Sequence, residues 1–164
     1  NRPMTAYEEI MIFSKGNTAN GSKVKMNYFP QGLIKKQSVR YDRSGTRFGT
    51  MAGKRPSQKS RIVSEYTNYP FDVLCIDSES KVVHPTQKPV ELLEYLIKTY
   101  TNENEVVLDN CMGSGSTGVA AVKNHRDFIG IELDKKYFEI AKERINEAAM
   151  LNSIAYKSTV GRSD

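Results

Sequence analysis

The period of apolar and polar positions changes along the chain, and each change predicts a different kind of element. Residues 7–14 form a short apolar run with β-forming residues, which predicts a buried strand. From Lys15 to Gln58 the chain is rich in Gly, Ser, Asn and Lys and lacks a helical stripe, so we expect loops and short strands there. Residues 72–76 are apolar again and are consistent with another strand.

Helical periodicity begins near Pro89. Apolar residues recur from there at spacings of three and four, as in a helix that packs one face against a core. Thr86 is expected as the N-cap, and Pro89 suits the first turn because its missing N–H costs nothing there. Asn102 and Asn104 end the predicted helix. Its apolar positions are Val90, Leu93, Leu96, Ile97 and Tyr100.

The next segment reads as strand, turn, helix, strand and helix. Residues 106–108 and 128–131 are wholly apolar, like strands buried in parallel sheets. A glycine-rich turn over 109–116, here called the glycine turn, and a helix over 117–124 connect them. This order predicts an α/β fold with a parallel sheet and helices on both faces. Asp134 is expected to cap a last helix whose apolar face contains Phe138, Ala141, Ile145 and Ala148.

The glycine turn matches a nucleotide-binding pattern. Residues 113–118 read Gly-Ser-Gly-Ser-Thr-Gly, which is G-x-G-x-x-G between a strand and a helix. Glu132 ends the next strand, where a carboxylate can accept both ribose hydroxyls of an adenosine. A tight turn followed by an acidic helix cap is the alternative interpretation of the same residues.

The charges near the turn bear on which adenosine ligand it would take. Asp109 lies at the end of the strand, where the glycine turn begins, and there it would repel a pyrophosphate. The same carboxylate suits a ligand that carries sulfonium and ammonium groups. The charges therefore favour S-adenosylmethionine over NAD, and a fragment of an NAD-dependent oxidoreductase stays the weaker alternative.

Composition narrows the function classes. Two cysteines and two histidines are too few for a disulfide framework or a convincing zinc pattern, so no metal is expected and a reducing, cytoplasmic setting is the simplest interpretation. No apolar run approaches the roughly 20 residues of a membrane span. The net charge of +5 is uneven, because residues 16–66 carry eleven Lys or Arg against Asp42 and Glu65. That basic segment indicates a polyanionic partner.

Three motifs together resemble a known family. They are His84-Pro85-Thr86-Gln87-Lys88-Pro89, the stretch from Val107 to Thr117, and Phe128-Ile129-Gly130-Ile131-Glu132-Leu133-Asp134. In this order and spacing they resemble the C-terminal part of β-class DNA amino-methyltransferases, which methylate adenine N6 or cytosine N4. The similarity covers residues 84–145 closely. It implies a Rossmann-like, S-adenosylmethionine-dependent methyltransferase fold with three α/β/α layers, incomplete in this chain.

The resemblance also implies roles for single residues. The methionine end of the cofactor would be held by His84, Thr86 and Lys88, and the lysine suits its carboxylate. A capped, solvated helix start is the alternative for His84 and Lys88.

The implied cofactor site continues at the glycine turn and beyond it. The methionine and ribose region would be lined by Asp109, Gly113 and Gly115, and Glu132 would bind the ribose hydroxyls. The last implied cofactor-binding residue is Cys111, which stands where the family often has Phe.

The same resemblance divides the chain. Residues 1–15 would be a late strand of the methyltransferase core, 16–80 the target-recognition region, 81–150 the cofactor-binding half and 151–164 a C-terminal tail. The recognition region contains the basic segment, which suits contacts to the phosphates of double-stranded DNA. A solvated basic loop is the alternative. The side chains expected on the DNA backbone are those of Arg40, Arg43 and Arg47.

The family's catalytic signature, Asp-Pro-Pro-Tyr or a variant, does not occur among these 164 residues, and no two of the six prolines are adjacent. In the family it precedes the recognition region, so we expect it before Asn1 and assign no catalytic residue. The sequence is thus interpreted as part of a bacterial or phage-encoded restriction-modification methyltransferase, with adenine N6 favoured over cytosine N4. The alternatives are an inactive DNA- or cofactor-binding remnant and one subunit of a split enzyme. A homodimer is also left open.

Overall fold

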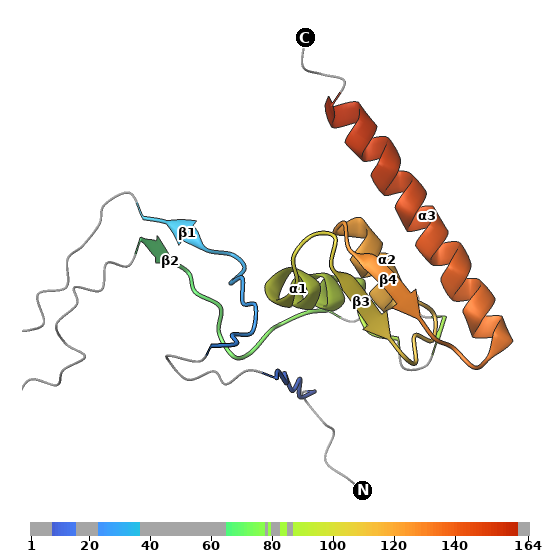
Figure 1. Cartoon of the computed structure of the whole chain (residues 1–164), viewed down its shortest axis with the longest axis horizontal. Coiled ribbons are helices and arrows are strands. Elements are labelled where there is room, and N and C mark those ends of the chain that lie inside the picture. The colour runs from blue at the N-terminus through green and yellow to red at the C-terminus, as the bar shows by residue number, and fades with distance from the viewer. Residues whose placement is uncertain are drawn as a thin grey trace, which may run out of the picture.

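The computed structural model falls into an irregular N-terminal part and an α/β unit (Figure 1). Thr86, Arg40, Arg43 and Arg47 lie outside the residues it describes, so the roles predicted for them in cofactor and DNA binding stay predictions. Side chains are described as far as Ser153. The described residues are 8–15, 23–36, 65–77, 79, 83–84 and 87–160.

The α/β unit is built around two parallel strands. β3 (Val106–Asp109) pairs with β4 (Asp127–Gly130) in a register that sets Val107 opposite Phe128. The connection between them contains α2 (Ser116–Lys123). The predicted strand–helix–strand unit and its parallel pairing are therefore confirmed.

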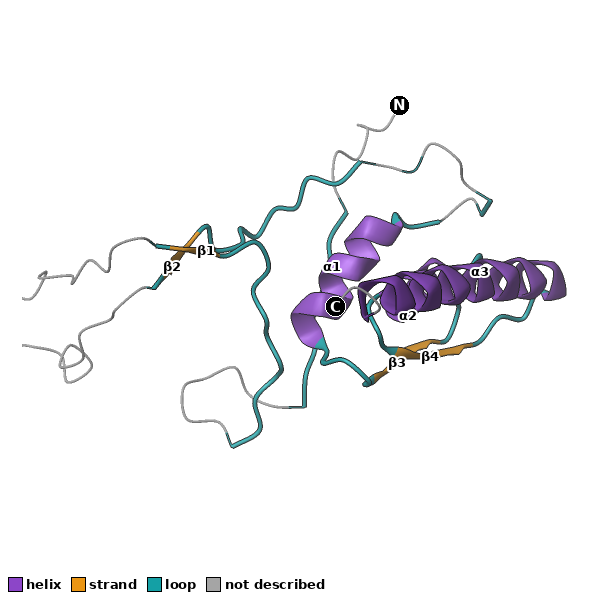
Figure 2. Cartoon of the chain, turned by 90° about the horizontal axis from the view of Figure 1, so that it is seen from above, coloured by secondary structure: helices purple, strands orange, loops and turns teal. Residues whose placement is uncertain are grey.

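Helices cover one face of this sheet. α1 (Val90–Tyr100), α2 and α3 (Lys135–Val160) all lie on the same side of the strands (Figure 2). Ile97, Ala120 and Ala121 form the buried core between α1 and α2, and Val107 and Phe128 pack against it from the sheet. The described residues thus provide a sheet and one layer of helices.

The other face of the sheet is open among the described residues. Its side chains alternate with the covered ones, and each is 53–62% exposed. The prediction that both strands are buried on both faces is therefore wrong for this part of the chain. A wholly apolar strand indicates that both faces suit burial, but it does not provide the elements that cover them. The exposed residues are Val106, Leu108, Ile129 and Ile131.

The helix starts agree only partly with the sequence. Pro89, with extended backbone at φ −58° and ψ 133°, is the N-cap of α1. The predictions that Thr86 caps this helix and that Pro89 lies in its first turn are therefore both wrong. Helical backbone is disfavoured at the residue before a proline, so the helix begins only after that position. The Asp134 cap of α3 is confirmed, because its Oδ1 accepts hydrogen bonds from the N–H groups of Lys136 (2.8 Å) and Tyr137 (3.2 Å).

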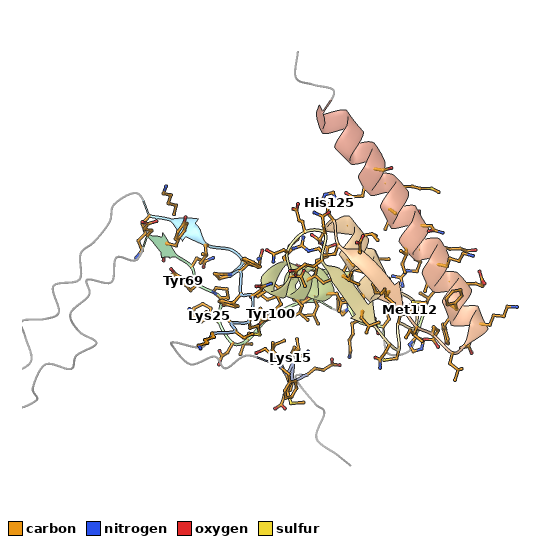
Figure 3. All side chains as sticks on the ribbon, viewed as in Figure 1. Lys15, Lys25, Tyr69, Tyr100, Met112 and His125 are labelled. Carbon is orange, nitrogen blue, oxygen red and sulfur yellow. The ribbon has the colours of Figure 1, made fainter. Side chains whose placement is uncertain are left out.

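Among its described residues, the N-terminal part contains a short antiparallel pair, β1 (Ile34–Lys35) with β2 (Tyr66–Thr67). It contacts α1 where the Phe29 N–H donates to the Thr99 carbonyl at 2.8 Å. Near this contact the rings of Tyr28 and Tyr100 lie 6.1 Å apart, and Figure 3 labels Tyr100 at the end of α1. Short strands were expected in this region, so that prediction is confirmed within the described residues.

Two other predicted strands are wrong. Residues 8–14 and 72–76 have no regular structure, and nearly all of them are exposed. A strand forms only when its N–H and C=O groups meet those of a neighbour. No described strand runs beside either segment, so their apolar composition is not sufficient. No helix in the described part of the chain is long and apolar enough to cross a membrane.

Candidate functional site

The glycine turn is held against the ends of both strands. The Met112 N–H donates to the Ile131 carbonyl at 3.0 Å, and the Gly115 N–H donates to the Met112 carbonyl at 2.8 Å. Gly113 and Gly115 have φ of +52° and +78°, a region that only glycine enters without strain. Met112 lies at this end of the sheet, near the start of α3 (Figure 3).

Gly115 also allows α2 and α3 to approach closely. A Cβ atom on Gly115 would lie 2.8 Å from the Cβ atom of Ala141 in α3. One turn further, a Cβ on Gly118 would overlap the side chains of Ile145 and Phe128. The glycines of the motif therefore serve both the turn and the packing of the helices.

Asp109 presents a fixed carboxylate at the end of β3. Its Oδ2 accepts a hydrogen bond from the Thr117 hydroxyl at 2.6 Å, and its Oδ1 accepts one from the Cys111 N–H at 3.1 Å. Both donors belong to the segment that follows the strand. The carboxylate therefore has a set orientation, and the turn closes around it.

Glu132 connects the same turn to the start of α3. Its Oε1 accepts a hydrogen bond from the Asp134 N–H at 2.9 Å, and its Oε2 accepts one from the Gly113 N–H at 2.8 Å. These backbone bonds, first that from Asp134 and then that from Gly113, hold the pKa of Glu132 below its usual value. The side chain is thus an ionised acceptor at neutral pH, and each oxygen can accept a further hydrogen bond.

His84 of the first motif packs over the turn. A Cβ on Gly113 would lie 3.6 Å from the His84 ring. The same ring meets Tyr137 of α3 edge to face, with centroids 4.4 Å apart. The structure therefore brings together the first motif, the glycine turn and the start of α3. Tyr137 was not predicted, although it lies three residues after the helix cap.

The side chains of two other predicted residues, Lys88 and Cys111, are exposed. The Lys88 ammonium group pairs with the Glu8 carboxylate at 2.7 Å, and both side chains are well exposed. The Cys111 side chain is exposed and lies 3.7 Å from the Asn110 side-chain oxygen. Within the described residues no group of His, Cys, Asp and Glu is suited to hold a metal ion.

A further contact of the first motif was also missed. The Gln87 Oε1 accepts a hydrogen bond from the hydroxyl of Ser114, inside the glycine turn, at 2.8 Å. The Ser114 carbonyl accepts one from Arg144 of α3 at 2.6 Å. Gln87 belongs to the first motif, but its position in the sequence does not reveal which segment it contacts.

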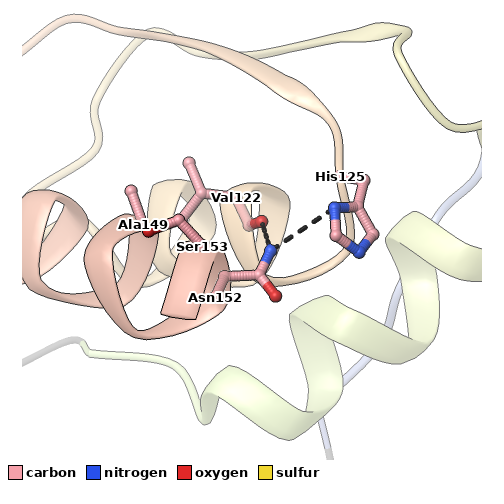
Figure 4. A pocket seen from close by; sticks show the side chains of 5 residues that line it. All are labelled: Val122, His125, Ala149, Asn152 and Ser153. Atoms are coloured by element: carbon pink, nitrogen blue, oxygen red, sulfur yellow. Dashed lines mark hydrogen bonds between the residues drawn. The ribbon is translucent and has the colours of Figure 1, made fainter. Parts of the chain in front are cut away.

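The end of α2 opposite the glycine turn is here called the far end. A hollow of about 300 Å³ lies there. The Asn152 amide nitrogen donates to the Val122 carbonyl at 2.8 Å and lies 3.4 Å from the His125 Nδ1 (Figure 4). The hollow shares no residue with the predicted cofactor site. Its lining residues are Val122, His125, Ala149, Asn152 and Ser153.

A family model described as DNA methylase matches residues 1–143. The chain belongs to this family of N6 and N4 DNA amino-methyltransferases. Type II methyltransferase M2.LlaDCHI of Lactococcus lactis subsp. cremoris is 52% identical over 66 residues, which are 40% of this chain and 24% of that protein. Type II methyltransferase M1.MboII of Moraxella bovis is 31% identical over 151 residues, covering 87% of this chain and 55% of the relative.

Solved structures include a complex of M1.HpyAVI with SAM, with 40% identity, a TM-score of 0.41, and coverage of 57% of this chain and 43% of the other. The matches span 24% of M2.LlaDCHI and 55% of M1.MboII, so the chain corresponds to only part of these relatives. The family match confirms the predicted S-adenosylmethionine cofactor at the level of the family, and the oxidoreductase alternative is wrong. The α/β class is confirmed by the parallel pair of β3 and β4 with helices packed against it.

Proposed function

We propose that this chain forms the cofactor-binding part of a DNA amino-methyltransferase that modifies adenine N6 or cytosine N4 in double-stranded DNA. The observation that carries the proposal is the pair of carboxylates, Asp109 and Glu132, fixed by backbone N–H groups around one glycine turn. Hydrogen bonds within the chain orient both carboxylates, and preorganised polar groups bind at a lower entropic cost. The relatives named above support a role in restriction-modification.

The residues fit S-adenosylmethionine chemically. The ionised Glu132 accepts the two ribose hydroxyls with its remaining lone pairs. Asp109 provides negative charge near the cationic methionine end. Lys88 binds the methionine carboxylate once it leaves its exposed pair with Glu8, which costs little because such pairs contribute roughly 0–1 kcal/mol. His84 covers the turn from the side of α3.

Calorimetry with S-adenosylhomocysteine tests the cofactor site. Glu132→Ala should weaken binding about tenfold or more, because hydrogen bonds to a charged acceptor are lost. Glu139→Ala, which removes an exposed carboxylate from α3 paired with Lys142 at 4.0 Å, is the matched control and should bind like the wild type. Equal affinities for wild type and folded Glu132→Ala would contradict the assignment.

Methyl transfer tests the extent of the activity. We expect no transfer of labelled methyl groups from S-adenosylmethionine to DNA by this chain alone, because its sequence lacks an Asp-Pro-Pro-Tyr-type motif to orient the target amine. The substrate should contain many adenines and cytosines in varied contexts. Measurable transfer would mean that an unrecognised segment supplies the catalytic groups.

Salt dependence tests whether the basic segment faces DNA. Each neutralised phosphate releases counterions, and we expect a log–log slope of affinity on salt of about −3 to −6 for duplex DNA. Joint reversal of Arg40, Arg43 and Arg47 to Glu should flatten the slope. Lys123→Glu, outside the segment and beside Glu94 at 3.5 Å, is the control and should leave the slope unchanged. A slope near zero would identify the segment as a solvated surface.

A further inference from the structure

Gln87 joins two segments that are far apart in sequence. Its Oε1 accepts hydrogen bonds from the Ser114 hydroxyl at 2.8 Å and from the Val83 N–H at 3.3 Å. Its Nε2 donates to a carboxylate oxygen of Glu79. Two donors therefore face the amide oxygen and an acceptor faces the amide nitrogen, so the partners determine which way the amide points.

Glu79 completes the arrangement on the side of α1. Its second oxygen, Oε1, accepts the Val90 N–H at 2.9 Å, at a helix start where Pro89 provides no side-chain cap. A carboxylate at this position also interacts favourably with the helix dipole. One side chain thus caps α1 and orients Gln87.

Ser114 receives this support at the centre of the glycine turn. It is 3% exposed and lies between Gly113 and Gly115, the two residues with positive φ. Gln87 holds its hydroxyl and Arg144 holds its carbonyl, so the turn is fixed from the sides of α1 and α3. The neighbouring Gly113 N–H donates to Glu132, so a shift of the turn would also move the acid expected to bind ribose.

We propose that Gln87 is a positioning residue of the cofactor site, and that the chain of hydrogen bonds Glu79–Gln87–Ser114 holds the glycine turn in its binding conformation. The inference rests on the proposed function, because the hydrogen-bond chain holds in place the cofactor site proposed above. Gln87 acts through Ser114 on the turn and does not itself contact the cofactor. Loss of the chain leaves a partly buried polar group without a partner and a site that must be ordered during binding.

An exchange of the two side chains tests the hydrogen-bond chain. Gln87→Glu places two carboxylates face to face. Glu79→Gln places two amides face to face, so that two N–H donors oppose each other or the pair is otherwise mismatched. In the double variant Glu79→Gln/Gln87→Glu, one amide and one carboxylate again face each other, with the direction of their bond reversed. The outer acceptors for Val90 and Ser114 are kept.

S-adenosylhomocysteine is the probe, and its affinity is measured by calorimetry together with the thermal unfolding of each variant. We expect each single variant to bind about tenfold more weakly and the double variant to return to within about twofold of the wild type. Gln31→Glu makes the same substitution as Gln87→Glu in the N-terminal part, where the amide donates to the Phe29 carbonyl at 2.7 Å, and should have no effect on affinity.

The outcomes separate the inference from the proposed function. If the wild type does not bind the probe, the proposed cofactor site is wrong. If the wild type binds and folded Gln87→Glu binds equally well, the site stands and the positioning role of Gln87 is overturned. A double variant as weak as the single variants would also overturn it. Should the exchange variants not fold, Gln87→Ala, Ser114→Ala and their combination replace them, and additive losses in affinity would contradict a shared path.

Discussion

α2 and α3 lie side by side, but their two ends are packed differently. At the glycine turn a Cβ on Gly115 would lie 2.8 Å from that of Ala141, so the helices approach as closely as glycine permits. At the far end a hydrogen bond from Asn152 to the Val122 carbonyl links the same two helices, and a hollow of about 300 Å³ lies beside it. Glycine and alanine therefore bring the helices into their closest approach at the end where the turn is held.

The polar groups follow the same division. At the glycine turn, Asp109 and Glu132 accept hydrogen bonds from four donors that belong to the turn, to α2 or to the entry of α3. At the far end, Asn152 donates to the Val122 carbonyl, and His125 adopts a positive φ of 59° in the loop after α2. The end of the helix pair at the glycine turn, here called the tight end, has the preorganisation that a binding site requires, and the far end lacks it.

The largest expected effect is that of a single methyl group on the tight end. Gly115→Ala should lower the free energy of unfolding by about 2–4 kcal/mol, combining the cost of a left-handed alanine with overlap against Ala141. Gly113→Ala has similar strain, but its Cβ would meet the His84 ring at 3.6 Å, an ordinary contact. Gly113→Ala should therefore lower the free energy of unfolding by about 1–2 kcal/mol.

Urea denaturation of both variants measures the difference. The two glycines lie in one turn and differ mainly in what a Cβ would meet, so the pair separates backbone strain from packing against α3. Equal losses would mean that the close approach of α2 and α3 contributes nothing beyond the conformation of the turn.

Local pattern predicted the parts of the fold whose causes are local. The spacing of apolar residues gave α1, and the order of elements around Gly113 gave the parallel pairing of β3 with β4. Asp134 was recognisable as a cap because capping depends on one side chain and the next few N–H groups. The position of Glu132 after a strand was sufficient to bring it to the turn.

The remainder depends on contacts that sequence spacing does not encode. Residues 8–14 have the composition of a strand but no described partner, and composition cannot provide one. The contact of Gln87 with Ser114 spans 27 positions and depends on where α1 docks. The pairing of Lys88 with Glu8 spans 80 positions and is equally invisible to a local pattern.

A smaller effect should appear in the pH dependence of stability. Hydrogen bonds hold the pKa of Glu132 below its usual value at the tight end, and bonds from Asn102 do the same for Glu105 toward the far end. A group whose pKa is lower in the folded state stabilises the fold above its unfolded pKa and loses this contribution as the pH falls through the folded value. The gap in stability between wild type and either Glu→Gln variant should therefore stay constant from pH 8 to about 5 and close below about pH 4.

Thermal unfolding across this range checks the sign, and ligand binding separates the two ends. At pH 7, Glu132→Gln should weaken S-adenosylhomocysteine binding and Glu105→Gln should not. A gap that widened as the pH fell toward 4 would mean that the carboxylate is not stabilised in its ionised form in the folded protein.

The smallest effect is expected at the far end. Ala149 is exposed and lines the hollow, so Ala149→Leu adds apolar atoms where space exists and should change the free energy of unfolding by no more than about 0.5 kcal/mol. The matched change on the same helix, Ala141→Leu, forces the larger side chain against Gly115 at a fully buried position and should cost about 3 kcal/mol. Because Ala149 is two turns of α3 away from the glycine turn, Ala149→Leu should also leave the S-adenosylhomocysteine affinity unchanged. A substantial loss of stability or affinity in this variant would show that the hollow closes in solution and that the two ends of the helix pair are coupled.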